Sequence, residues 1–170
     1  MPIHLAIINP KSPENMGSIL RAAGCYQAQS IRYTGERYAR AKAFSTDTKN
    51  AHLNIAVTQV PAVIDPINDN HLTKVAIELV EGAMPLPHFE HPEKALYIFG
   101  PEDGSIEQDV IDQCEHVVYV PTVGCMNLAA TVNVLLYDRL AKTTVMPSDD
   151  NIIKSSRDTN NRTKLGEVSI

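Results

Sequence analysis

Three short polar segments carry the residue types that could do chemistry, and each follows an apolar run of the chain. They are residues 9–21 (NPKSPENMGSILR), 100–105 (GPEDGS) and 120–131 (VPTVGCMNLAAT). Taken singly, a glycine after a strand is ordinary turn chemistry, and Ser12 or Asn15 could simply cap a helix. Three such segments together favour a ligand site, because ligands of open α/β sheets bind beyond the carboxyl ends of the strands.

The middle segment narrows the kind of ligand. Glu102 and Asp103 place two carboxylates among its glycines, and adjacent carboxylates repel a pyrophosphate. The chain also contains neither a P-loop lysine motif nor a G-x-G-x-x-G fingerprint. An unrelated nucleotide enzyme is therefore disfavoured. A cofactor with positive charge fits better, and S-adenosylmethionine, a sulfonium, is the candidate.

Strands and helices alternate around these segments. Short apolar runs rich in β-formers predict strands at residues 3–8, 30–34, 53–60, 74–80, 95–99 and 116–121. The first helix follows the first strand, because apolar residues recur there at helical spacing: Met16, Ile19, Leu20 and Ala23, with Tyr26 extending the stripe. We therefore expect an α/β fold with a mostly parallel sheet flanked by helices.

Two further helices are predicted in the second half of the chain. Ser105 with Gln108 makes a capping box for a helix over residues 106–114. The last helix is expected over residues 127–142, and its inward face consists of Leu128, Val132, Leu135, Leu136 and Leu140.

Length and composition indicate one soluble globular domain. The chain has 170 residues, 44% of them apolar, and its apolar runs are shorter than the roughly 20 residues that span a bilayer. We expect the domain to cover residues 1–146, and residues 147–170 to form a polar, flexible tail. The three cysteines are too few for a disulfide scaffold. With no signal peptide at the start, this predicts a cytoplasmic protein.

Charge is unevenly distributed. The net charge is −5, yet between residues 21 and 49 six basic residues face only two acidic ones. Such a local excess permits a polyanionic partner, although a solvated surface explains it equally well. The tail carries Lys154, Arg157, Arg162 and Lys164, for which an inert terminus is favoured over contact with RNA.

The three segments together resemble the motifs of the SpoU/TrmH family, RNA ribose 2′-O-methyltransferases of the SPOUT class. The resemblance rests on Asn15-x-Gly17-x-x-x-Arg21, on FGPEDG at residues 99–104 and on VPTVGCMNL at residues 120–128. In length the chain is most similar to the compact TrmL-type tRNA methyltransferases.

The resemblance implies a fold, a cofactor and an assembly. The fold is the SPOUT fold with a carboxyl-terminal trefoil knot, and the assembly is a homodimer in which each active site is completed across the interface. The cofactor is S-adenosylmethionine, with tRNA favoured over rRNA as the substrate and no membrane partner. The residues implied to bind the cofactor are Leu79, Glu81, Gly82, Gly100, Glu102, Gly104, Val120, Cys125, Asn127 and Leu128.

The resemblance also implies catalytic and RNA-binding residues. Arg21 corresponds to the family's catalytic arginine, with Asn15 and Glu102 positioning it or the ribose. A guanidinium is almost never deprotonated, so we expect Arg21 to bind phosphate and to stabilise the developing alkoxide. The RNA-binding residues are expected to be Arg21, Arg32, Arg37, Arg40 and Lys42.

Two departures from the family pattern leave a second function open. Cys125 and Ala129 stand where relatives commonly have serine, and a thiol forms weaker hydrogen bonds than a hydroxyl. A non-catalytic RNA-binding member of the same fold is therefore the alternative. His88 and His91 have zinc-like spacing, but no further ligands cluster beside them in the sequence, so we expect no metal.

Overall fold

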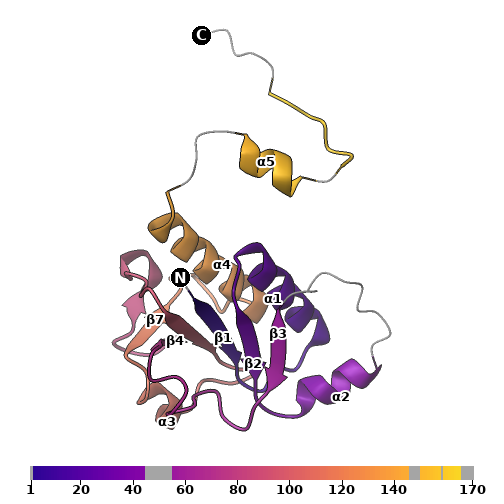
Figure 1. The fold of residues 1–170 in the computed structure, drawn as a ribbon. Coiled ribbons are helices and arrows are strands. Elements are labelled where there is room, and N and C mark those ends of the chain that lie inside the picture. The colour runs from indigo at the N-terminus through magenta and orange to yellow at the C-terminus, as the bar shows by residue number, and fades with distance from the viewer. Residues whose placement is uncertain (1, 45–54, 146–149, 158, 166–170) are drawn as a thin grey trace.

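A seven-stranded parallel sheet forms the centre of the computed structural model, which describes residues 2–44, 55–145, 150–157 and 159–165 (Figure 1). The strand order is β3-β2-β1-β6-β4-β7-β5, and every neighbouring pair is parallel. The strands are β1 (Ile3–Ile7), β2 (Ser30–Tyr33), β3 (Ala56–Gln59), β4 (Thr73–Ile77), β5 (Met84–Pro85), β6 (Ala95–Phe99) and β7 (His116–Tyr119). The predicted α/β class is confirmed.

Helices connect the strands and cover the sheet. They are α1 (Pro13–Cys25), α2 (Arg37–Phe44), the 3-10 turn η1 (Leu86–His88), α3 (Gln108–Ile111), α4 (Leu128–Thr143) and α5 (Asn151–Ser156). The predicted first and last helices are confirmed as α1 and α4, with Tyr26 as the carboxyl-terminal cap of α1. None of the described helices combines the length and apolar character that a membrane span requires.

The central strands are buried on both faces. Along β6, Tyr97 belongs to the core cluster with residues of α1 and α4, whereas Ile98 belongs to a second cluster with Val63 and Ile106. All five residues of β6 are at most 1% exposed. This two-sided burial is why the strands read as continuous apolar runs rather than as alternating patterns.

Several predicted elements are shorter than expected, β4 and α3 among them. β4 ends at Ile77 rather than at residue 80, and the next residue, Glu78, turns the chain. Its carboxylate accepts the N–H of Leu79 (2.9 Å) and that of Ile106 (2.9 Å), so it ties the loop after β4 to the loop after β6.

The predicted capping box is wrong. α3 covers only Gln108–Ile111, its N-cap is Glu107, and that cap forms no side-chain hydrogen bond. The Gln108 amide donates instead to Asp112 (2.7 Å). The helix begins at Gln108, later than the predicted start at residue 106, and the Ile106 N–H donates to Glu78 instead.

Four elements were not predicted from the sequence: α2, β5, η1 and α5. Helix α5 lies within the segment expected to be a flexible tail, and Figure 1 shows it beyond the carboxyl-terminal end of α4. Residues 53 and 54 of the predicted third strand lie outside the described residues.

The strand order brings the polar segments together. β1, β6 and β4 are adjacent, and β7 pairs with β4 on one side and β5 on the other. The three polar segments leave the carboxyl ends of β1, β6 and β7 at one edge of the sheet. β7 thus lies between β4 and β5, which precede it in the sequence. The knot remains a prediction.

Candidate functional site

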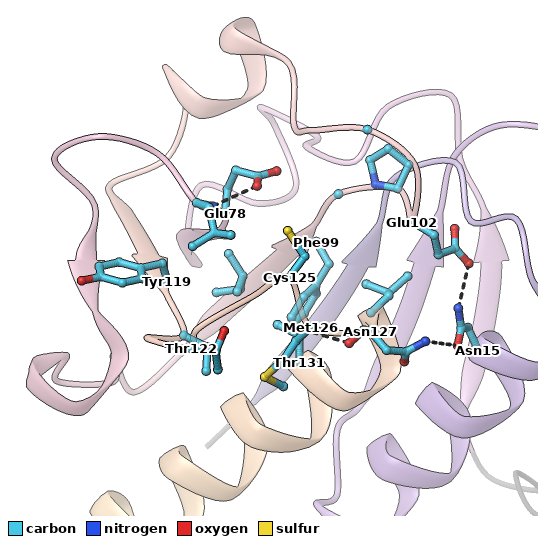
Figure 2. Close-up of a pocket in the computed structure, with 17 residues that line it drawn as sticks. Asn15, Glu78, Phe99, Glu102, Tyr119, Thr122, Cys125, Met126, Asn127 and Thr131 are labelled. Atoms are coloured by element: carbon cyan, nitrogen blue, oxygen red, sulfur yellow. Dashed lines mark hydrogen bonds between the residues drawn. The ribbon is translucent and has the colours of Figure 1, made fainter.

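A cavity of about 290 Å³ lies at the carboxyl edge of β4, β6 and β7 (Figure 2). Its walls come from the ends of these strands, from the loop before α4 and from the first turns of α1 and α4. The lining residues are Asn15, Ile77, Glu78, Leu79, Phe99, Gly100, Pro101, Glu102, Gly104, Tyr119, Val120, Thr122, Cys125, Met126, Asn127, Leu128 and Thr131.

Most of the expected cofactor-binding residues line this cavity. Eight of the ten do so, namely Leu79, Gly100, Glu102, Gly104, Val120, Cys125, Asn127 and Leu128. Glu81 and Gly82 do not line it; both are exposed in the turn after β4, where Gly82 has a φ of 86°. The structure thus gathers residues that are up to 49 positions apart in the sequence around one hollow.

A chain of side-chain hydrogen bonds joins the three polar segments (Figure 2). Asn127 Nδ2 donates to Asn15 Oδ1 (2.9 Å), and Asn15 Nδ2 donates to Glu102 Oε1 (3.2 Å). Asn127 also caps α4, because its Oδ1 accepts the N–H groups of Ala129 and Ala130. Each asparagine therefore uses both ends of its amide, which fixes the orientation of Asn15 at the cavity wall.

Glu102 is held in its ionised form by the loop before α1. Its carboxylate accepts the backbone N–H groups of Lys11 (2.8 Å) and Ser12 (3.1 Å). Partial burial acts to raise the pKa of Glu102, but these hydrogen bonds and the one from Asn15 outweigh it, so the pKa lies below its ordinary value. The cavity thus keeps a negative charge at one wall.

Arg21 lies away from the cavity of its own chain. It is exposed on α1, six residues after Asn15, which places it about 120° around the helix from Asn15. Within the described residues it forms no hydrogen bond or ion pair, and it does not line the cavity. Its guanidinium is therefore presented to solvent rather than used to hold the fold.

The other expected RNA-binding residues differ in their surroundings. Arg32 forms an ion pair with Asp69 (2.8 Å) in which its side chain is 17% exposed. Arg37 donates to both carboxylate oxygens of Asp103 (2.8 Å each). Arg40 is exposed on α2, and the Lys42 side chain lies outside the described residues. Among those of the five whose side chains the structure describes, Arg21 and Arg40 are thus the ones exposed to an external partner.

Arg37 connects α2 to the loop that follows β6. Its guanidinium also donates to the carbonyl oxygen of Asn9, at the end of β1. The hydrogen bond from Arg37 keeps the pKa of Asp103 below its ordinary value, with the charges of Arg37 and Lys11 acting in the same direction. Arg37 therefore contributes to the shape of the site by joining two of its loops.

Sequence reasoning missed Glu78, which lines the cavity from the end of β4. The prediction placed it inside a strand that continued to residue 80, where a lone carboxylate reads as an outward-facing side chain. A charged residue directly after an apolar run was the signal that could have revealed it. Tyr119, inside the strand predicted at residues 116–121, was missed in the same way; Thr122 lies in the third polar segment but was not expected to line the site.

The histidine pair does not form a metal site. His91 Nδ1 lies 2.7 Å from the Tyr97 hydroxyl oxygen, and its Nε2 lies 2.9 Å from Asp138 Oδ2. Burial lowers the pKa of His91, although Asp138 acts in the opposite direction. His88 is exposed, and no group of three metal-ligating side chains occurs in the described part of the chain.

Comparison with known proteins identifies the family. Residues 2–137 match the SpoU rRNA Methylase family, so the chain belongs to it. A search of curated proteins finds no match. The match covers both the sheet and the cavity, and it includes all three polar segments.

Solved structures share the fold at low sequence identity. An AdoMet-bound rRNA methyltransferase from Sinorhizobium meliloti is 18% identical with a TM-score of 0.63, over 85% of this chain and 57% of that one. The A. aeolicus TrmH/SpoU tRNA modifying enzyme is 12% identical with a TM-score of 0.66, over 82% and 74% of the two chains. The chain thus spans little more than half the length of the first of these proteins.

A third structure is nearer to this chain in length. It was described for its insights into the 2-OH methylation of C/U34 on tRNA. It is 18% identical with a TM-score of 0.64, over 82% of this chain and 89% of that one.

Proposed function

We propose that the chain is an S-adenosylmethionine-dependent RNA methyltransferase that methylates a ribose 2′-hydroxyl, with tRNA favoured over rRNA and the cytoplasm as its compartment. The observation that carries the proposal is the cavity that the three family motifs frame together. The relatives support the same reading, since one was solved with AdoMet and another concerns 2-OH methylation of tRNA.

The lining of the cavity fits S-adenosylmethionine. Glu78 and Glu102 are its charged lining residues, and no lysine, arginine or histidine lies among them. Such a lining favours a cationic sulfonium and ammonium over a phosphate. Leu79, Val120 and Leu128 supply apolar surface for a flat ring. When bound, the cofactor supplies an electrophilic methyl group on sulfur.

The residues of the chain then have separate tasks in our proposal. Arg21 binds the phosphate beside the target ribose and stabilises the oxygen as it loses its proton. Asn15 positions the ribose or Arg21, and Glu102 holds Asn15 and the loop before α1. The proton leaves to water or to a phosphate oxygen, because an arginine does not accept it.

In our proposal a homodimer supplies the arginine that the single chain does not place at its own cavity. Arg21 faces away from the cavity of its own chain, so it would act at the cavity of a partner subunit. We therefore propose that two copies associate and that each contributes Arg21 to the other's site, with Arg40 extending the RNA-binding surface. Arg32 is left out of that surface, because its ion pair with Asp69 already uses it.

The alternative function is an RNA-binding protein that has lost methyl transfer. Cys125 and Ala129 favour it, since a thiol and a methyl group stand where relatives commonly have serine. In the structure Cys125 is exposed at the cavity, and the backbone N–H of Ala129 donates to Oδ1 of Asn127, the N-cap of α4. The intact chain of hydrogen bonds through Asn127, Asn15 and Glu102 favours the active enzyme.

Transfer of labelled methyl from S-adenosylmethionine to total tRNA and to rRNA tests the proposal, with nuclease mapping of the labelled nucleoside. We expect label in one 2′-O-methylated nucleoside. Arg21→Ala should keep cofactor affinity and the dimer but lose methyl transfer by about 10²-fold or more, as when a transition-state donor is removed.

The outcomes separate the alternatives. RNA and cofactor binding without transfer to any RNA offered would contradict the enzymatic proposal and favour the RNA-binding alternative. Loss of cofactor binding by well-folded Arg21→Ala would contradict the place assigned to Arg21.

A further inference from the structure

The segment that follows α4 gathers cations around one surface hollow. Lys154, Arg157, Arg162 and Lys164 line it together with Thr159 and Asn161, and its volume is about 540 Å³. Among the described residues that line it there is no carboxylate; Asp158 lies outside the described residues. We call residues 150–157 and 159–165 the basic arm; Figure 1 shows its helix α5 beyond the carboxyl-terminal end of α4 and away from the sheet.

The charge of the arm contrasts with that of the chain. Between Lys154 and Lys164 four cations face a single carboxylate in the sequence, Asp158, whereas the whole chain has a net charge of −5. Within the described residues none of the four forms an ion pair. Like charges that converge on one hollow repel one another unless an anion lies between them. The arrangement therefore indicates an anionic partner.

The remaining side chains of the arm favour RNA as that partner. Thr159, Asn161 and Thr163 place hydroxyl and amide groups among the cations, and such groups contact phosphate and sugar in nucleic-acid complexes. The only large exposed apolar residues of α5 are Ile152 and Ile153. A helix of six residues with two such side chains offers little of the apolar face that a membrane-surface helix uses.

We propose that the basic arm binds RNA phosphates outside the nucleotide that is methylated, and so enlarges the part of the RNA that the protein contacts. This inference rests on the proposed function, because it takes RNA as the substrate. The arm lies outside the family match, which ends at residue 137. It would add affinity without taking part in the reaction.

The test uses the full chain and a variant with four neutral residues, Lys154→Gln, Arg157→Gln, Arg162→Gln and Lys164→Gln. The control keeps every charge: Lys154→Arg, Arg157→Lys, Arg162→Lys and Lys164→Arg. Binding to total tRNA is measured over a range of salt concentrations. Each phosphate contact contributes about 0.7 to 0.9 to the slope of log affinity against log salt, so we expect the neutral variant's slope to be shallower by about 3.

At low salt the neutral variant should also bind tRNA about tenfold more weakly or worse, and the control variant should bind as the original chain does. Affinity for S-adenosylmethionine should not change in either variant, because the arm is not part of the cavity lining. This last measurement also shows that both variants are folded.

An unchanged affinity and salt slope in the neutral variant, with methyl transfer by the original chain intact, would overturn the arm's role and leave the proposed function standing. Failure of the original chain both to bind and to methylate RNA would overturn both. A neutral variant that keeps its RNA affinity but no longer adsorbs to vesicles of phosphatidylglycerol would show that the arm binds lipid phosphate instead, and would also overturn the proposal.

Discussion

Glu78 and Glu102 are two carboxylates of one cavity, and each is held by backbone N–H groups from a neighbouring loop. Glu102 holds the loop before α1 through Lys11 and Ser12. Glu78 holds the loop after β6 through Ile106. The negative charge that suits a cationic cofactor is thus also what fixes the walls of the site.

The substitution Glu78→Gln removes the negative charge of this side chain and keeps its shape. The amide has one acceptor oxygen where the carboxylate has two, so either Leu79 or Ile106 loses its partner. We expect weaker S-adenosylmethionine binding, by about tenfold, and a loss of about 1 to 2 kcal/mol in the free energy of unfolding. Calorimetric titration and chemical denaturation measure the two effects.

Glu107→Gln is the matched control. Glu107 is exposed and, as the N-cap of α3, forms no side-chain cap hydrogen bond. The same substitution there should leave cofactor affinity unchanged. Equal affinities in all three proteins would show that Glu78 has no part in binding.

The turn between β2 and α2 decides where Arg37 lies. Asn9 and Gly35 both have positive φ, of 45° and 76°, and they are packed against each other. A Cβ on Gly35 would lie 2.2 Å from Asn9 Oδ1 and 2.7 Å from Asn9 Cγ. Position 35 in this turn therefore requires glycine. The turn places Arg37 where its guanidinium contacts Asn9 and Asp103.

Gly35→Ala should accordingly destabilise the protein by about 1 to 3 kcal/mol, because it combines a strained backbone with a steric clash. Gly17→Ala is the control: Gly17 lies within α1, and a Cβ there meets nothing within 4 Å. It should be neutral or stabilising by up to about 1 kcal/mol. Thermal unfolding of both variants measures the contrast; two variants of equal stability would contradict this account of the turn.

The elements that could be predicted are those whose apolar pattern points to the core. β6 and α4 were found because their buried residues are continuous or helically spaced. α2 was missed because its sequence, RYARAKAF, places cations among small residues; of its side chains that the structure describes, at residues 37–41, only Tyr38 is in the core. The end of β4 was misplaced because the apolar run continues past Ile77 through Leu79 and Val80, although the strand does not.

Much of the lining of the cavity could be predicted, but the contacts between its residues could not. Motif positions such as Gly100 and Leu128 were found through the resemblance. The hydrogen bonds from Asn127 to Asn15 and on to Glu102 join residues up to 112 positions apart, and no local pattern in a sequence encodes such a contact. The exposure of Arg21 likewise emerged only from the folded helix.

On the scale of the whole molecule, α4 runs from the carboxyl ends of the strands towards their amino ends. Its first cap, Asn127, lies at the cavity. Near its other end Arg139 is 5% exposed and donates to the Tyr97 hydroxyl (2.9 Å) and to the carbonyl oxygens of Pro92 and Glu93. Anchoring of the far end fixes the helix along its axis, which places Asn127 reproducibly at the site.

The outer face of α4 is where we expect the proposed dimer to form. Val134 is 38% exposed and Tyr137 is 62% exposed, three residues apart on one side of the helix. Buried aromatic side chains commonly dominate the binding energy of interfaces. α4 also packs beside α1, the helix that carries Arg21. Association through this face would therefore bring Arg21 near a partner subunit.

Tyr137→Glu should convert the dimer to a monomer, because it buries a charge in an apolar interface. Sedimentation velocity measures the mass, and the methyl-transfer assay measures the consequence: activity should fall by about as much as in Arg21→Ala, since each site would lack the arginine of its partner. Gln113→Glu adds the same charge beyond α3, near the opposite face of the sheet, and should change neither property. A Tyr137→Glu monomer with full activity would mean that Arg21 serves its own chain, and the cavity would then have to close onto α1 in a conformation different from the one seen here.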